Sequence, residues 1–185
     1  MLDNGVVRYA LIAEQPTTIG EVGGLISPRL TTLAAALRHA GLNVSVSSSI
    51  TSWLKTHAVF VTAVCGALYA AEGSAATLAA TPALLDHFIE ATRQGFQVLH
   101  QAGFKVAPLK LRILFVFMPT WFARSYWQRY FASPMGELLF AAHAKAANDE
   151  MVELVRECRE LFPAQGVPVP LETLWREVES YRATP

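Results

Sequence analysis

After residue 50, almost every stretch of this chain repeats its apolar residues at the 3.6-residue spacing of an α-helix, and this pattern constrains the fold most. Ile50 to about Tyr69 is predicted to be a largely apolar helix. Pro82–Gln101 carries apolar residues along one side, and Gly103 is placed to end that helix. Leu109–Phe131 is expected to form two short helices because Pro119 interrupts the pattern. The second part of the chain is therefore predicted to be mainly helical.

Two further helices complete this part. A long helix is predicted for Gly136–Phe162, and a last one for Leu171–Tyr181. Two apolar runs resemble membrane spans, but Ala58–Ala71 and Ile113–Met118 are shorter than the ~20 residues that a span needs. Both runs are therefore interpreted as buried core, and no membrane is expected as a partner.

The first part of the chain has a different pattern. Val6–Ala13 and Asn43–Ser47 are rich in β-branched or alternating apolar residues, which is typical of strands. Between them, Ser27 and Pro28 form a helix-start signal, and Gly41 is placed to end that helix. We expect a strand-helix-strand unit over residues 1–48 and a helical domain over 49–185. So small a unit needs a neighbour to cover its sheet.

Composition excludes several classes of protein. About half of the 185 residues are apolar, and 15 basic residues balance 15 acidic ones, so nucleic acid is an unexpected partner. Cys65 and Cys158 lie in apolar helical patterns, and we interpret both as buried thiols of a protein in a reducing compartment. The opening residues lack the pattern of a signal peptide, so a cytoplasmic location is expected. The five histidines have no metal-ligand spacing, which argues against a metal site.

Lys55 is the first candidate for chemistry because it is the one lysine or arginine in an otherwise apolar helix that reaches almost to Glu72. A buried lysine is costly unless it faces a partner or a cavity, and burial lowers its pKa toward values useful in proton transfer. The alternative is a lysine that extends to solvent at the end of a helix.

Glu150 is the second candidate. On a continuous helix, His143 and Glu150 share one face with small residues between them, about two turns of ~5.4 Å apart. They are then able to flank one small ligand without touching each other. The alternative is a solvated face, since Asp149, Glu153 and Glu157 make acidic residues common on this segment.

Four short signatures occur in order along the chain: PTTIGEVGG near the start, ITSWLKTH at 50–57, AANDEM at 146–151 and GVPVP at 166–170. Together they resemble the C-terminal half of the ketopantoate reductase (2-dehydropantoate 2-reductase) family. The resemblance covers essentially residues 9–181. It implies a helical bundle of the 6-phosphogluconate dehydrogenase C-terminal-like type, preceded by a small βαβ remnant of the nucleotide-binding half.

The resemblance also implies roles for individual residues. Enzymes of this family reduce 2-dehydropantoate with NADPH in pantothenate biosynthesis, using a lysine as acid and a glutamate that positions lysine and substrate. Lys55, in ITSWLKTH, matches the lysine, and Glu150, sixteen residues before the glycine of GVPVP, matches the glutamate. Glu90 resembles a further glutamate of the family. The implied substrate is a 2-oxo acid or related ketone, and NADP is the implied cofactor.

The chain departs from the family at the substrate positions. Family members typically carry asparagines four and eight residues after the lysine, where this chain has Val59 and Ala63. Because buried polar pairs decide which substrate a site accepts, the resemblance does not identify the substrate. Thr62, on the same helix face as Lys55, is a candidate replacement contact. Ser133, next to Pro134 and Met135, is a second candidate substrate contact, and His143 is a third.

The glycine-rich segment Ile19–Gly24 is the one candidate for a nucleotide loop, and it lacks the G-x-G-x-x-G spacing of a dinucleotide fold. The alternative is a simple turn between strands. A hydride-transfer enzyme would then need a Rossmann domain supplied elsewhere, so the cofactor-binding residues stay unassigned.

The aromatic residues between 121 and 131 indicate either core or an association surface, and a homodimer is expected. The sequence thus predicts half of a ketopantoate reductase-like oxidoreductase. The alternative is a non-catalytic helical binding or dimerisation module with the same architecture.

Overall fold

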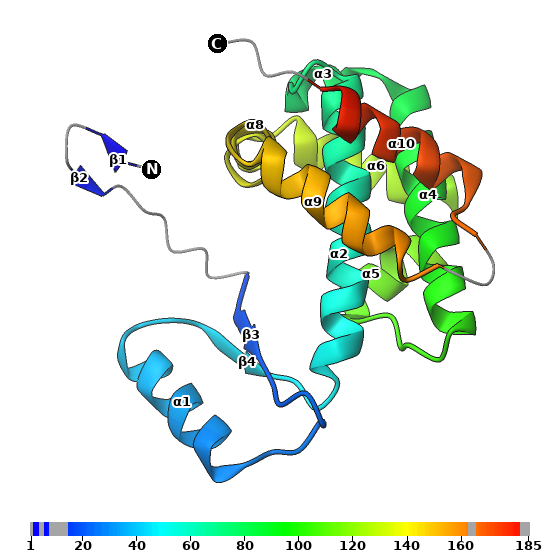
Figure 1. Ribbon diagram of the computed structural model, residues 1–185. Helices are drawn as coiled ribbons and strands as arrows, with labels where there is room; N and C mark the ends of the chain where they lie inside the picture. Colours follow the sequence, from blue (N-terminus) through cyan, green and yellow to red (C-terminus); the bar gives the residue numbers. More distant parts are fainter. Residues whose placement is uncertain (1, 4–5, 8–14, 163–165, 182–185) are drawn as a thin grey trace. The chain divides into compact units, whose positions relative to one another are not determined.

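The computed structural model describes residues 2–3, 6–7, 15–162 and 166–181 (Figure 1). The described chain is mainly helical with a small two-stranded parallel sheet, and it divides into two compact units, residues 1–51 and 52–185. At the start, β1 (Leu2–Asp3) pairs antiparallel with β2 (Val6–Val7). The predicted strand Val6–Ala13 begins in β2, and its residues 8–13 lie outside the described residues.

The first unit contains a strand-helix-strand arrangement, but its first strand is Thr17–Ile19 and not the predicted Val6–Ala13. β3 (Thr17–Ile19) pairs parallel with β4 (Val44–Val46), and α1 (Pro28–His39) connects them. The Ser27 side chain caps α1 by accepting a 3.2 Å hydrogen bond from the Leu30 amide. Gly41 follows the helix with a φ of 86°, a conformation that favours glycine and ends the helix. The predictions for this helix and for the second strand are confirmed.

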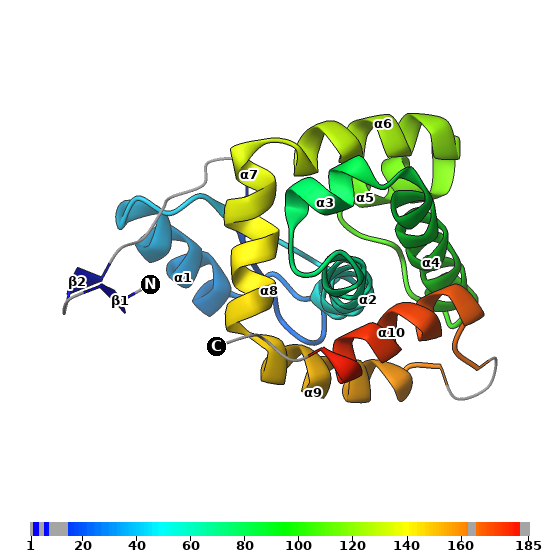
Figure 2. The same cartoon turned by 90° about the horizontal axis from the view of Figure 1, so that it is seen from above.

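Helix α2 (Ile50–Ala70) forms the centre of the second unit, and Figure 2 shows it end-on with α3, α4, α8 and α10 around it. Its 21 residues are long and apolar enough to cross a membrane by length and composition alone. Val59, Ala63 and Leu68 are nevertheless completely buried against neighbouring helices. Most of this helix is therefore core, as the sequence predicted for Ala58–Ala71.

The next helices pack against this core. Helix α3 (Ala75–Ala80) was not anticipated from the sequence; Ser74 caps it by accepting a 3.1 Å hydrogen bond from the Thr77 amide. Helix α4 (Pro82–Gln101) has the predicted bounds, and its predicted apolar side is buried. Gly103 ends it with a φ of 87°. Helix α10 (Val169–Ser180) packs along α4.

The region around Pro119 divides as predicted. Helix α5 (Leu109–Arg112) continues into a π-helical turn, η1 (Ile113–Phe117), and α6 (Thr120–Phe131) starts after the proline. Arg93 on α4 holds this junction. Its guanidinium donates to the carbonyl oxygens of Phe115 at 2.8 Å and Met118 at 3.1 Å, and so compensates for the interrupted helical hydrogen bonds.

The prediction of one long helix over Gly136–Phe162 is wrong. The structure has α7 (Pro134–Gly136), a π-helical turn η2 (Glu137–Ala141), α8 (Ala142–Ala146) and α9 (Asn148–Arg159). The chain changes direction at Ala147, which leaves helical geometry with φ −122° and ψ 32° (Figure 2). The Tyr69 hydroxyl donates a 2.6 Å hydrogen bond to the carbonyl of Ala144, so this break leaves no buried acceptor unpaired there.

Two glycines allow the helices to approach closely. A Cβ on Gly66 of α2 would lie 2.3 Å from the carbonyl oxygen of Leu174 on α10. A Cβ on Gly95 of α4 would lie 2.6 Å from the Val59 side chain. Both cysteines, Cys65 and Cys158, are buried thiols as predicted.

Candidate functional site

Lys55 lies one and a half turns into α2, where its side chain is half-buried. The ammonium nitrogen sits 4.3 Å from the centroid of the Phe104 ring, in the loop after α4. In the part of the chain that the structure describes, no carboxylate lies within ion-pair distance of this nitrogen. Lys55 is therefore a cation held by an aromatic ring and not neutralised by an acid.

Glu150 lies in the first turn of α9 and is exposed. A carboxylate at this position interacts favourably with the positive end of the helix dipole, and Asp149 shares the same turn. No cation of the described residues forms an ion pair with Glu150. Its surroundings are thus those of a solvated helix start.

The charges of Lys55 and Glu150 act on two buried thiols. Burial raises the pKa of Cys158, near the end of α9, to about 12, and the positive charge of Lys55 opposes part of that rise. Burial likewise raises the pKa of Cys65 to about 12, and the negative charge of Glu150 adds to it. Cys65 comes ten residues after Lys55, a distance of ~15 Å along a helix. Lys55 and Glu150 thus each influence a different thiol.

Thr62 does not face a cavity. Its side chain is completely buried, and its hydroxyl donates to the carbonyl oxygens of Ala58 at 2.8 Å and Val59 at 3.2 Å. Val59 and Ala63, at the positions where the family has asparagines, are also completely buried. Packing against other helices covers this face of α2, so its side chains serve the core.

His143 is exposed on α8, and the break at Ala147 places it on a different helix from Glu150. The prediction that these two residues share one continuous helix face is therefore wrong. The physical reason is the change of direction at Ala147, which the hydroxyl of Tyr69 stabilises. Helical periodicity alone does not reveal such a break.

Glu90, on α4, is engaged in local contacts. Its carboxylate accepts hydrogen bonds from Arg93 at 3.1 Å and from Gln94 at 2.7 Å. Because the same Arg93 guanidinium binds the junction between η1 and α6, Glu90 helps to orient a structural arginine.

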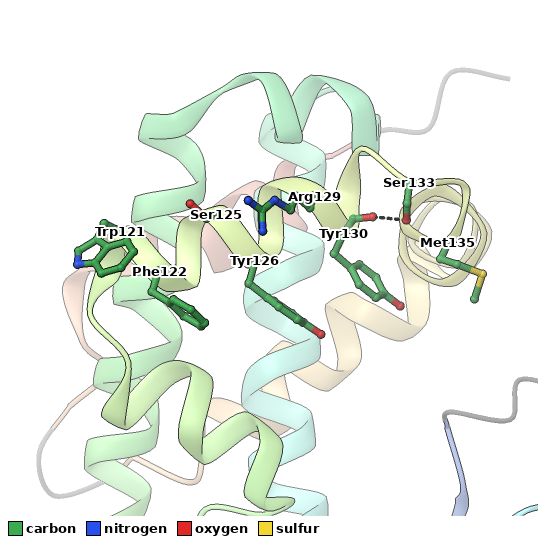
Figure 3. Close-up of a pocket in the computed structure, with 8 residues that line it drawn as sticks. All are labelled: Trp121, Phe122, Ser125, Tyr126, Arg129, Tyr130, Ser133 and Met135. Atoms are coloured by element: carbon green, nitrogen blue, oxygen red, sulfur yellow. Dashed lines mark hydrogen bonds between the residues drawn. The ribbon is translucent and has the colours of Figure 1, made fainter.

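A hollow of about 620 Å³ opens on the outer side of α6 (Figure 3). Phe122, Tyr126 and Tyr130 lie on successive turns of α6 and extend to the same side of the helix. Ser133, the predicted substrate contact, lies at its far end and donates a 2.6 Å hydrogen bond to the Tyr130 carbonyl. The complete lining consists of Trp121, Phe122, Ser125, Tyr126, Arg129, Tyr130, Ser133 and Met135.

The aromatic residues of α6 divide between the core and the surface. Trp127 and Phe131 are buried in the core, whereas Trp121 and Phe122 are exposed beside the hollow. The sequence spacing separates the two groups. Residues 122, 126 and 130 repeat every four positions and share one face of the helix, whereas 127 and 131 share the next face. This face was not predicted from the sequence as a ligand site.

The glycine-rich segment Ile19–Gly24 forms a loop before α1. The Glu21 carboxylate accepts hydrogen bonds from the Ser27 hydroxyl at 2.5 Å and from Arg29. The hydrogen bond from Arg29, together with that from Ser27, lowers the pKa of Glu21 to about 2. Glu21 and Arg29 thus form an ion pair beside the start of α1, and a nucleotide-binding role for this loop stays a prediction.

Within residues 15–162 and 166–181, no group of three or more His, Cys, Asp or Glu side chains is arranged to hold a metal ion. Comparison of the chain with protein-family models, with curated proteins and with solved structures gives no match.

Proposed function

We propose that this chain is the helical substrate domain of a cytoplasmic ketopantoate reductase-like oxidoreductase. In this proposal the second unit is a bundle of the 6-phosphogluconate dehydrogenase C-terminal-like type. The reaction is the reduction of a 2-oxo acid or related ketone by NADPH. The support is the ordered set of four signatures, together with a helical unit that follows a small parallel β-α-β unit.

The environment of Lys55 is the observation that supports the proposal. Lys55 is a half-buried ammonium group without a carboxylate partner among the described residues, on a helix with no other lysine, arginine or acid. Such a group is free to donate a hydrogen bond or a proton to the oxygen of a ketone, or to pair with the carboxylate of a 2-oxo acid. An ammonium neutralised by a fixed carboxylate would bind an anionic substrate less well.

The proposal rests on Lys55 and not on a Lys55–Glu150 pair. Glu150 is exposed on α9 and forms no ion pair with a cation of the described residues, so its positioning role stays a prediction. Since no nucleotide-binding residue is assigned in the described part of the chain, NADPH would be bound by a Rossmann domain supplied by another chain or another part of the protein. The proposal therefore assigns no step of the reaction to the residues that bind NADPH.

Binding of the substrate alone tests the role of Lys55 without any cofactor. Calorimetric titration of the chain with 2-dehydropantoate, and with a series of simpler 2-oxo acids, is expected to show saturable binding. Lys55→Ala should weaken the tightest of these interactions by about tenfold, or ~1.4 kcal/mol. Lys105→Ala is the matched control, because it removes an exposed lysine next to Phe104. Equal losses in both variants would remove Lys55 from the site.

A non-catalytic helical binding or dimerisation module is the second candidate function. It is favoured by the complete burial of Val59, Thr62 and Ala63, which leaves none of these three side chains available to contact a substrate. The hollow on α6 is the corresponding binding site. Titration with NADPH, followed by nicotinamide fluorescence with and without 2-dehydropantoate, separates the two functions. If neither compound binds at millimolar concentration, the second candidate is the better account.

A further inference from the structure

The segment around α6 has an unusual distribution of charge. Between Glu90 and Glu137 the chain contains no acidic residue, although the whole chain has 15 acidic and 15 basic residues. Three cations of this segment, Lys110, Arg112 and Arg129, are exposed and form no ion pair with any described residue. In contrast, Arg156, Arg159 and Arg176 elsewhere in the second unit each pair with a carboxylate. This part of the protein presents uncompensated positive charge.

The same region exposes large apolar side chains. A second hollow, of about 350 Å³, is lined by Leu109, Lys110, Ile113, Leu114 and Tyr126. Tyr126 also lines the first hollow, so the two hollows adjoin at this side chain. We call the two together the α6 surface. Two of its lining residues, Trp121 and Leu109, are 65% and 57% exposed, which is costly for side chains of this size unless a partner covers them.

The cations lie among the aromatic rings of the α6 surface. The Lys110 nitrogen is 5.7 Å from the centroid of the Tyr126 ring. Arg129 lines the first hollow next to Tyr126 and Tyr130 (Figure 3). A partner that fills the hollows with apolar side chains must therefore also bring negative charge alongside them, because the cations would otherwise lose water without gaining a partner.

We propose that the α6 surface binds an acidic amphipathic helix of another protein. Such a helix places apolar side chains at positions i, i+3, i+4 and i+7, which lets consecutive turns fill the two adjoining hollows. Glutamate or aspartate beside this apolar stripe pairs with Lys110 and Arg129. A polypeptide fits better than a bilayer surface because the apolar side chains line recesses, whereas insertion into lipid requires them to protrude. This function is separate from the reaction proposed for Lys55.

Selection from a displayed library of helical peptides tests the proposal. Each peptide carries the i, i+3, i+4, i+7 apolar stripe, and its flanking positions carry Glu, Gln or Lys in equal proportion. Selection on the intact wild-type chain should enrich Glu over Lys at the flanking positions. For a selected peptide, the double variant Lys110→Gln/Arg129→Gln should weaken binding about tenfold or more, and ~0.5 M salt should weaken it similarly.

Arg176→Gln is the control, since it removes an exposed arginine on α10 and should leave affinity unchanged. Tyr126→Ala, checked for folding by circular dichroism, should abolish binding because both hollows lose their shared wall. Three results would overturn the proposal. One is the absence of Glu enrichment. Another is cosedimentation with phosphatidylglycerol vesicles in place of peptide binding. The third is a dimer of the chain that Trp121→Ser dissociates, which would show that a second copy covers the surface.

Discussion

The hydroxyl of Tyr69 donates a 2.6 Å hydrogen bond to the main-chain carbonyl of Ala144, 75 residues later in the chain. The carbonyl belongs to the last turn of α8, where the helix stops and α9 begins in a new direction. A side chain of the central helix thus stabilises the bend that separates His143 from Glu150. The Tyr69 ring also stacks on Tyr181, with the ring centroids 4.1 Å apart.

Tyr69→Phe should lower the free energy of unfolding by about 1–3 kcal/mol, because it removes the hydrogen bond to the Ala144 carbonyl while keeping the ring. Urea unfolding followed by circular dichroism measures the change. Tyr126→Phe is the matched control, since Tyr126 is half-buried and its hydroxyl has no hydrogen-bond partner in the described part of the chain. An equal effect of both substitutions would contradict a stabilising role for the Tyr69 hydrogen bond.

Gly66→Ala should destabilise the second unit by about 1–3 kcal/mol or more, since the new Cβ would lie 2.3 Å from the Leu174 carbonyl oxygen. Either α2 and α10 must move apart or α10 must shift along α2. Thermal unfolding measures the effect. Gly23→Ala is the control, because a Cβ added there would have no atom within 4 Å and the φ of Gly23 is ordinary. An unchanged melting temperature for Gly66→Ala would show that the two helices do not approach so closely.

The two tryptophans of α6 should differ sharply. Trp127→Ala removes a ring that is 4% exposed and packs against Phe60, Phe88 and Phe115, so a loss of about 3–5 kcal/mol is expected. Trp121→Ala removes a ring that is 65% exposed and should change stability by about 0.5 kcal/mol or less. Urea unfolding by circular dichroism gives both values. Similar losses would mean that Trp121 is also covered in solution.

Stability should fall at alkaline pH because of the buried thiols. Burial raises the pKa of Cys65 and of Cys158 from 9.0 to about 12. The folded state therefore retains protons that the unfolded state releases. The contribution is fully present below about pH 9 and is lost between about pH 9 and 12, by roughly 2 kcal/mol for each thiol at pH ~10.5.

Unfolding in urea at pH ~8 and pH ~10.5 measures this loss, and the double variant Cys65→Ala/Cys158→Ala is the comparison. Its free energy of unfolding should depend less on pH over this range. Tyr69, whose pKa burial raises to about 12, remains in the variant and accounts for part of the residual slope. Identical slopes for the two proteins would show that the thiols do not contribute.

Local signals in the sequence determined much of this fold. Ser27-Pro28 and Gly41 predicted α1 because capping and left-handed backbone geometry depend on a few adjacent residues. Pro119 predicted the boundary between η1 and α6, since a proline cannot continue the helical hydrogen bonds. The apolar stripe of α4 predicted its buried face. Each of these inferences needed only residues within one or two turns of each other.

Contacts between distant segments decided the rest. Asn148 and Asp149 after Ala147 are residue types common at helix starts, but the hydrogen bond from Tyr69 to Ala144 joins segments 75 residues apart. The environment of Lys55 depends on Phe104, and the burial of Thr62 depends on the helices around α2. The sequence by itself determined where helices start, end and carry apolar stripes, because these are properties of short segments. Only the tertiary structure decided which polar side chains reach a surface together, because that depends on which helices pack side by side.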